Sequence, residues 1–283
     1  MTFRNLLQVV PAGLWWIVLV RLTVVGAMIA VIVRLVQSRR RERAATRRWA
    51  TLSKVTARLA ETLHADTTLE DVARLLVPEF ADWCSMHVVE DGGVQRAAVV
   101  HADAAVERRL RERLAGAPFV ADAPVGPALV IRTGKADLHR DGSAAASVLT
   151  GRLGAELLHE AGIGSLLSVP LRTHQQTVGA LTLHRRMAGA YDDQDLEWAG
   201  DLARQIALAV ENTRLYEDAK RLFEQSASAN WVSTADGRIV ACNQMFAHLL
   251  GFESIDDVRN TPATELYADP ADRDRLIEEL VRD

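Results

Sequence analysis

Residues 164–186 read GSLLSVPLRTHQQTVGALTLHRR, with two apolar runs on either side of a polar loop. The runs from Ser165 to Leu171 and from Thr177 to Leu183 are rich in aliphatic residues, which predicts two strands joined over 172–176. A similar pattern, ADWCSMHVVEDGGVQRAAVVHA, occupies residues 81–102 and centres on Asp91-Gly92-Gly93, a sequence typical of a hairpin turn. The sequence therefore predicts an antiparallel sheet built from two hairpins.

Helical patterns surround these strands. Leu52, Val55, Leu59 and Leu63 follow helical spacing, and a second short helix, capped from Asp66, Thr67 or Thr68, is expected to end at Leu76, before Pro78. Helical stretches over 104–114 and 144–160, with a Pro/Gly-broken segment between them, separate the two hairpins and are expected to form a roof over the sheet. The fold class is therefore α+β, with an antiparallel sheet flanked by helices.

A long helix is predicted after Asp192, which is placed as the N-cap with Asp195 three positions later, and it runs for about thirty residues. Residues recur along it at alternating steps of four and three, which is typical of a coiled-coil seam, although the polar Thr213 and Lys220 make this seam an imperfect one. The seam residues are Leu202, Ile206, Ala209, Thr213, Tyr216, Lys220 and Phe223. Packing on the sheet explains the first half of this pattern as well as a partner helix does, so only the second half favours dimerisation.

The order of these elements resembles a GAF domain over residues 52–218. The segments that carry the resemblance are LHADTTLEDVARLLVPEFADWC (63–84), SVPLRTHQQTVGALTL (168–183) and YDDQDLEWAGDLARQIALAVENTRLY (191–216). Cyclic-nucleotide-binding members carry an Asn-Lys pair and then Phe-x-x-x-Asp-Glu. Here Tyr191 and Asp195 match that tail, but Leu196 replaces the glutamate and the Asn-Lys pair is missing. Bilin-binding members use a cysteine in the roof, and residues 104–160 contain none. The resemblance thus disfavours both ligands and leaves the cofactor unknown.

Other candidate sites are better explained by structural roles. Gly162 and Gly164 lack the third glycine of a dinucleotide loop, so we interpret them as a turn that enters a strand. His139 and His159 fall in the roof, where a haem or metal role is conceivable, but neither has a paired ligand in the sequence. Cys84 is interpreted as a small buried residue. We predict no catalytic residues and no metal site.

Residues 230–252, NWVSTADGRIVACNQMFAHLLGF, predict two short strands around Asp236-Gly237 and then a helix. Asn243 is the expected N-cap, Phe246, Leu249 and Leu250 form the expected apolar face, and Gly251 ends the helix. Cys242 closes a strand and His248 lies on another side of the helix, so the pattern does not indicate a thiolate-imidazole pair.

This run resembles the start of a PAS domain, whose Asp-Gly hairpin, Asn cap and Gly-Phe end it matches. The later segments SIDDV (254–258) and TPATELYADPADRDRLIEEL (261–280) resemble the later helices of that domain, with Asp269 as a cap and Pro270 at the first helical position. The resemblance implies three further strands beyond Asp283, so we expect the unit to be incomplete and to fold poorly alone. Phe246, Leu249, Leu250 and Leu276 are then expected to stay partly exposed.

The N-terminal region has a membrane pattern. Residues 17–36, IVLVRLTVVGAMIAVIVRLV, are nearly all apolar and long enough for one span, with Arg21 and Arg34 close enough to its ends to snorkel. Trp15 and Trp16 precede the span and QSRRRERAATRRWA (37–50) follows it, which predicts an outside N-terminus and a cytoplasmic remainder. A cleaved signal peptide is the alternative. The net charge of −4 gives no general attraction to nucleic acid, and two distant cysteines give no disulfide or zinc framework.

These patterns together predict a membrane-anchored bacterial sensor in the inner membrane that passes a signal through dimeric helices near 50–64 and 202–223. The alternatives are the input half of a sensor histidine kinase or diguanylate cyclase, whose catalytic signatures are missing from this sequence, and an interaction module without a ligand. The expected segments are an extracytoplasmic N-terminus (1–16), a transmembrane helix (17–36), a basic juxtamembrane helix (37–51), a GAF domain (52–218), a connecting helix (219–229) and an incomplete PAS domain (230–283).

Overall fold

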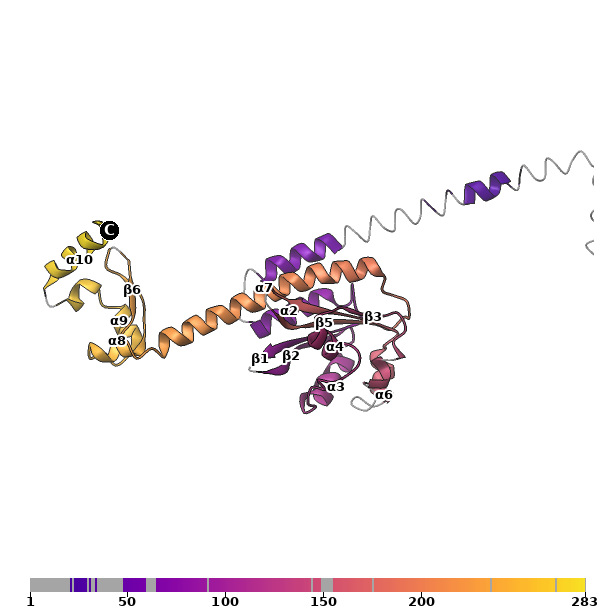
Figure 1. Cartoon of the computed structure of the whole chain (residues 1–283), viewed down its shortest axis with the longest axis horizontal. Coiled ribbons are helices and arrows are strands. Elements are labelled where there is room, and N and C mark those ends of the chain that lie inside the picture. The colour runs from indigo at the N-terminus through magenta and orange to yellow at the C-terminus, as the bar shows by residue number, and fades with distance from the viewer. Residues whose placement is uncertain are drawn as a thin grey trace, which may run out of the picture.

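The computed structural model describes most of the chain beyond residue 47. The described residues are 21, 23–29, 31, 34, 48–59, 65–90, 92–143, 145–148, 155–174, 176–234, 236–267 and 269–282. Within them the chain forms one α+β unit and a smaller second unit, which the long helix α7 joins (Figure 1).

The first unit is built on a five-stranded antiparallel sheet. Its strands are β1 (Trp83–Glu90), β2 (Gly93–His101), β3 (Asp137–His139), β4 (Ser165–Arg172) and β5 (Thr177–Arg185), in the spatial order β2-β1-β5-β4-β3. Both predicted hairpins are confirmed, and Gly92 has a φ of 77° in the tight turn between β1 and β2. The short strand β3 was not predicted, because three residues within a Pro/Gly-broken segment give no periodic signal.

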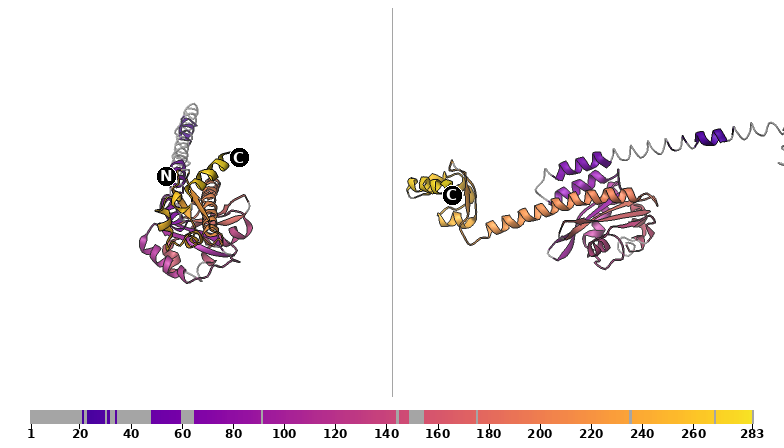
Figure 2. Two further views of the ribbon diagram at one scale, coloured as in Figure 1. Left: turned by 90° about the vertical axis from the view of Figure 1, so that its left-hand side faces the viewer. Right: turned by 45° about the horizontal axis from the view of Figure 1, so that its top comes forward.

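One face of the sheet carries the helices that hold the main core. These are the helical residues 48–59, α2 (Ala65–Leu76) and α7 (Asp193–Glu224), which Figures 1 and 2 show side by side on the same face. Val55, Leu69, Leu76, Leu202 and Ile206 are fully or almost fully buried there. The apolar residues of the helix over 48–59 are therefore packed against the chain's own core.

The opposite face carries the roof. It consists of α3 (Ala104–Ala115), α4 (Pro127–Thr133) and α6 (Ala155–Ala161), below the sheet in Figure 1. The predicted helix over 104–114 is confirmed. The prediction of a helical stretch over 144–160 is confirmed at 145–148 and over α6, which extends one residue further to Ala161, and residues 144 and 149–154 lie outside the described residues. Helix α4 was not predicted, since Gly126 and Pro127 look like a break but serve as N-cap and first residue.

Helix α7 begins as predicted and then leaves the sheet. Asp192 accepts a hydrogen bond from Asp195 N (2.9 Å) and donates its own N–H to Asp195 Oδ2 (3.0 Å), which forms a capping box. Leu202 and Ile206 are fully buried in the chain's own core, whereas Tyr216 is 52% exposed. The first half of the predicted seam is therefore occupied by the sheet, and the face free for a partner lies further along α7.

The second unit is a small hairpin with helices packed on it. Its elements are β6 (Trp231–Ser233), β7 (Ile239–Cys242), α8 (Gln244–Leu249), α9 (Ile255–Arg259), η3 (Ala263–Leu266) and α10 (Pro270–Arg282). Asn243 is the predicted N-cap and also ties the unit to α7, because its side chain accepts from Phe246 N and donates to the carbonyls of Phe223 and Ser228. Ile239, Cys242, Phe246, Ala247, Val258 and Ala263 form a buried core.

Two predictions for this unit need correction. Phe246 is 7% exposed and faces the core, while Leu249 (71%) and Leu250 (37%) are exposed, so the three do not share one apolar face. The Asp236-Gly237 turn is a longer loop, because Thr234 N donates to the Arg238 carbonyl across it. The side chain of Leu276 lies outside the described residues. Part of the expected exposure is thus confirmed and part is wrong.

Half of the predicted membrane span, residues 17–36, lies outside the described residues. Residues 21, 23–29, 31 and 34 are helical, and Val24, Val25, Met28, Ile29 and Val31 are 45–60% exposed. Across the described parts of the chain, no helix has the length and apolar content needed to cross a bilayer.

Candidate functional site: a cavity between sheet and roof

A cavity of about 70 Å³ lies between the sheet and the roof. Its floor comes from β1, β4 and β5, and its cover comes mainly from the loop 119–126 and the start of α4. The described lining residues are Trp83, Ser85, His87, Arg96, Leu114, Phe119, Val120, Ala123, Val125, Gly126, Pro127, Ala128, Ala145, Val148, Leu166 and His184. The roof side of the cavity is therefore apolar, and its sheet side is partly polar.

Strand alternation places the polar groups of the floor. Side chains at every second position share a face of a sheet, so Trp83, Ser85 and His87 all point to the roof. Cys84 and Met86 point to the other face, where they are fully buried in the main core. A β-bulge follows Met86 in the pairing of β1 with β2, which is a common feature beside functional sites.

Two neighbouring strands bring Trp83 and His184 together. They are paired across β1 and β5, and their rings stack with centroids 4.1 Å apart and an interplanar angle of 12°. Both residues are 3% exposed, and within the described part of the chain neither Trp83 Nε1 nor His184 Nδ1 has a hydrogen-bond partner. Burial lowers the pKa of His184 to about 3, so its imidazole is neutral at pH 7.

The cover of the cavity is fixed at several points. Gly126 has a φ of 72° and donates its N–H to Asp137 Oδ2 (2.7 Å), which ties the start of α4 to β3. Arg132 donates to the Ala121 carbonyl at 2.7 Å, and Arg96 donates to the Leu114 carbonyl at 2.8 Å. These bonds hold the loop and the end of α3 over the floor.

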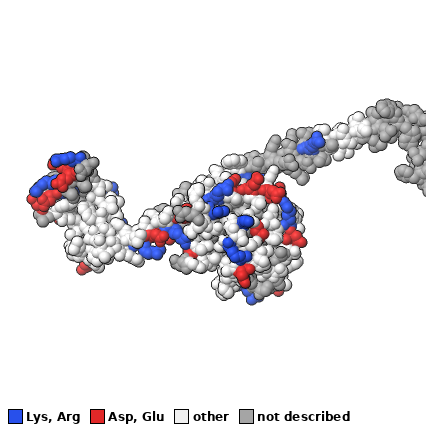
Figure 3. Space-filling view, in the orientation of Figure 1, with Lys and Arg blue, Asp and Glu red and all other residues white. Residues whose placement is uncertain are grey.

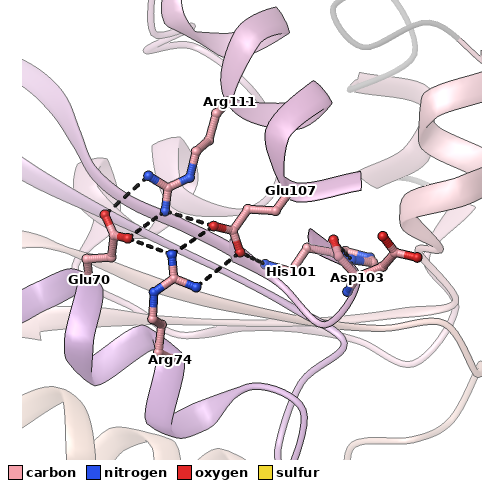
Figure 4. Close-up of polar contacts among 6 residues, drawn as sticks. All are labelled: Glu70, Arg74, His101, Asp103, Glu107 and Arg111. Atoms are coloured by element: carbon pink, nitrogen blue, oxygen red, sulfur yellow. Dashed lines mark hydrogen bonds and ion pairs between the residues drawn. The ribbon is translucent and has the colours of Figure 1, made fainter. Parts of the chain in front are cut away.

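A four-residue charge network, which we call the edge clamp, joins the roof to the other helical layer (Figure 4). It consists of Glu70 and Arg74 on α2 and Glu107 and Arg111 on α3. Arg74 contacts Glu70 at 2.7 Å and Glu107 at 2.9 Å, and Arg111 contacts the same two carboxylates at 2.9 and 3.1 Å. Because strand β2 is the sheet edge, the edge clamp connects the two faces around it.

A backbone hydrogen bond to Glu107 and the ionised state of Glu70 support the edge clamp. Glu107 is only 9% exposed and also accepts a hydrogen bond from the backbone N–H of His101, at the end of β2. The hydrogen bond from Arg111 and the neighbouring guanidinium of Arg74 lower the pKa of the Glu70 carboxyl below its ordinary value. Glu70 therefore stays ionised well below neutral pH.

The histidines and cysteines considered from the sequence do not line this cavity. His139 is on β3, with Nε2 2.8 Å from Asp137 Oδ1, and His159 is exposed on α6. Cys84 faces the main core, where burial raises the pKa of its thiol, and Cys242 is buried in the second unit. His248 is exposed there and contacts Gln244 instead of Cys242. No cluster of three or more metal-binding side chains occurs among the described residues.

The remaining motif residues have structural roles. Tyr191 is buried and donates its hydroxyl to the Phe80 carbonyl (3.0 Å), and Asp195 combines the capping box with a 2.6 Å ion pair to Arg48. Gly164 approaches Arg186 so closely that a Cβ would lie 2.0 Å from its carbonyl oxygen. The interpretation of Gly162 and Gly164 as a turn before a strand is confirmed.

The sequence contains one local signal for the site, on strand β1. Polar residues at alternate positions of an otherwise apolar strand, as in Trp83, Ser85 and His87, indicate a face that contacts something other than a plain core. The contacts of the edge clamp between α2 and α3 and the pairing of Trp83 with His184 have no such signal, because they join residues far apart in the chain.

Comparisons with known proteins identify two domain families. The family model described as GAF domain matches residues 50–210, more than half of the chain, and a model described as PAS domain matches residues 217–282. None of the curated proteins matches the chain. The confirmed antiparallel sheet with flanking helices is of the GAF type.

Three solved structures illustrate the similarity. The GAF domain of a phosphoenolpyruvate-protein phosphotransferase from Coxiella burnetii is 16% identical, with 62% of this chain and 98% of that chain covered and a TM-score of 0.47. The free methionine-R-sulfoxide reductase of Neisseria meningitidis is 17% identical (59% and 89% covered, TM-score 0.45). The GAF domain of a proposed sensor histidine kinase from Pseudomonas syringae pv. tomato is 20% identical (64% and 99% covered, TM-score 0.43).

Proposed function

Because the chain belongs to the GAF domain family and also carries a PAS domain match, we propose that it senses a ligand in the cavity and relays the signal through α7. GAF and PAS domains fit a sensory signalling role. The observation that carries the proposal is the edge clamp, which links the roof over the cavity to α2. Helix α2 packs with α7 in the main core, and α7 continues to the second unit.

The relay has a defined physical route. A ligand that displaces the roof moves α3, whose Leu114 lines the cavity and whose Glu107 and Arg111 hold α2. Leu69 and Leu76 of α2 share a core with Leu202 of α7, and close-packed cores transmit small shifts instead of absorbing them. At its far end α7 contacts the second unit through Asn243.

Membrane anchoring forms the second part of the proposal. Support comes from the apolar run over 17–36, from the arginines that follow it, and from the exposed apolar side chains at residues 24, 25, 28, 29 and 31. With the N-terminus outside, the helix over 48–59 enters the main core beside α7, where Arg48 pairs with Asp195. A reporter enzyme joined after Arg48 should therefore be active only as a cytoplasmic fusion. An exported reporter would reverse the orientation.

Dimerisation through the free face of α7 forms the third part. Leu208, Leu215 and Leu222 lie seven residues apart and are 44%, 62% and 75% exposed. Apolar residues at this spacing are typical of a helix that packs on a second helix. A kinase or cyclase output partner, expected from the sequence, stays a prediction.

Hydrogen exchange in the full chain tests the relay. Ala145→Leu adds bulk to the cavity lining and should press on the roof as a ligand would, so exchange in α2 should change by roughly 2- to 30-fold. Glu107→Gln in the same background should confine the change to the roof, because it weakens the edge clamp. Ala105→Leu adds the same atoms on the exposed side of α3 and should leave α2 unaffected.

The relay proposal fails if Ala145→Leu changes exchange only in the roof while the edge clamp is intact. It also fails if Glu107→Gln leaves the response of α2 unchanged.

A further inference from the structure

We propose that the cavity binds a small neutral molecule with a ring-sized apolar body and one oxygen acceptor, which Trp83 Nε1–H recognises. This inference rests on the proposed function, since it specifies the ligand class of the same cavity.

The unpaired indole of Trp83 indicates the acceptor. Buried N–H groups in folded proteins almost always have a partner, and an indole N–H can only donate. Trp198, on the other face of the sheet, follows this rule and donates to the Arg48 carbonyl at 3.3 Å. Trp83 is only 3% exposed, and its Nε1 has no partner among the residues that the structure describes. A ligand that enters beside it would satisfy this donor with an oxygen atom.

The charge of the lining favours a neutral ligand. The described lining residues include no carboxylate and no lysine. Arg96, the one guanidinium among them, donates to the Leu114 carbonyl, and His184 carries no charge at pH 7. A charged ligand would lose its hydration here without gaining a free counter-charge.

The shape of the lining favours a flat apolar body. The stacked rings of Trp83 and His184 lie on the sheet side beside Ser85, His87 and Arg96, and Phe119 and aliphatic residues form most of the roof side. An apolar cavity of about 150 Å³ accommodates benzene. The present cavity of about 70 Å³ is smaller, so a single ring would lift the roof as it enters. Binding and roof movement are thereby coupled.

Four probes of similar size separate these requirements. Acetophenone has a ring and a carbonyl acceptor, ethylbenzene lacks the acceptor, benzoate is an anion and benzylammonium is a cation. The full chain is labelled with 4-fluorophenylalanine, and the fluorine resonance of Phe119 reports occupancy at the cavity. Phe246, which is buried in the second unit, serves as an internal control. Affinities are calculated from the concentration of free probe in water, so partition of the probe into lipid or detergent does not change them.

Acetophenone should shift the Phe119 resonance saturably and bind about fivefold more tightly than ethylbenzene, the usual effect of one net hydrogen bond. Benzoate and benzylammonium should bind at least about tenfold more weakly than acetophenone. Trp83→Phe keeps an aromatic ring but removes the N–H, so acetophenone and ethylbenzene should then bind equally. The matched variant Trp198→Phe should preserve the difference, because that indole already has a partner.

Equal binding of acetophenone and ethylbenzene to the unmodified chain would overturn the role of Trp83, and this comparison needs no variant. Tighter binding of benzoate or benzylammonium than of acetophenone would overturn the neutral class and leave the relay proposal standing. If none of the four probes moves the Phe119 resonance, the ligand class is wrong, and the hydrogen-exchange test still decides the relay independently.

Discussion

His184 is a buried base whose charge state affects folding. Its pKa is about 3 in the folded chain because burial disfavours the imidazolium, whereas an unfolded histidine has a pKa near its ordinary value of 6.5. The unfolded chain therefore binds one more proton between these values. The stability that neutral His184 permits is complete above pH 6.5 and is lost as the pH falls toward 3.

Replacement of this residue should flatten the acid side of the stability profile. In urea unfolding of residues 48–283, His184→Phe should remove a slope of about 1.4 kcal/mol per pH unit near pH 5 while keeping a ring against Trp83. His159→Gln, at an exposed position, should leave the slope unchanged. Parallel profiles for His184→Phe and the unmodified chain would mean that His184 is protonated normally in the folded state.

At the scale of single elements, sequence patterns predicted those structures whose signal is local. Strands β1, β2, β4 and β5 and the capping box of α7 were found because alternation, turn residues and caps act over a few positions. The three-residue strand β3 and the short helix α4 were missed, since long-range pairing and the roof determine them. The cavity was not predicted because its walls come from segments up to about a hundred residues apart.

Helix α7 carries two separate stripes of apolar residues. The periodic residues near its start, such as Leu202 and Ile206, are buried in the main core. This agrees with the interpretation that the first half of the pattern packs on the sheet. The leucines at 208, 215 and 222 form a different stripe that the chain itself leaves exposed. A substitution that tests dimerisation must therefore avoid Ile206, whose loss would unfold the core.

Leu215→Asp should weaken self-association without affecting the fold. A buried charge in a helix pair is costly, so light scattering of residues 48–283 at tens of micromolar should change from dimer toward monomer. Leu249→Asp is the matched control, because Leu249 is 71% exposed on the second unit and outside the stripe. A monomeric unmodified chain, or a dimer that tolerates Leu215→Asp, would contradict the proposed interface.

At the scale of the whole molecule, α7 is the element that both folded units share. Its first half is part of the main core, and its end is bonded to Asn243 of the second unit. Acidic and basic side chains are interleaved on the face of the first unit that Figure 3 shows, and further charges gather near α10. This face therefore has no broad single-sign surface of the kind that binds a nucleic-acid backbone.

Residues 48–59 and α7 lie in one layer. They run side by side in Figure 1 and in the right-hand view of Figure 2, and the indole of Trp198 donates to the carbonyl of Arg48. We therefore expect a shift of α7 that starts at the cavity to reach residues 48–59 through this contact.

The most direct test of the relay is a measurement of the distance between α3 in the roof and α7. Spin labels at Arg108→Cys on α3 and Glu217→Cys on α7 occupy exposed positions, while Cys84 and Cys242 are buried. The labelled full chain, diluted with unlabelled chain in lipid nanodiscs, reports the distance within one molecule by double electron–electron resonance. Filling the cavity with Ala145→Leu should shift the distance distribution by about 1 to 2 Å or more, as helix shifts do. An unchanged distribution, with the cavity filled and the fold intact, would contradict the claim that the cavity controls α7.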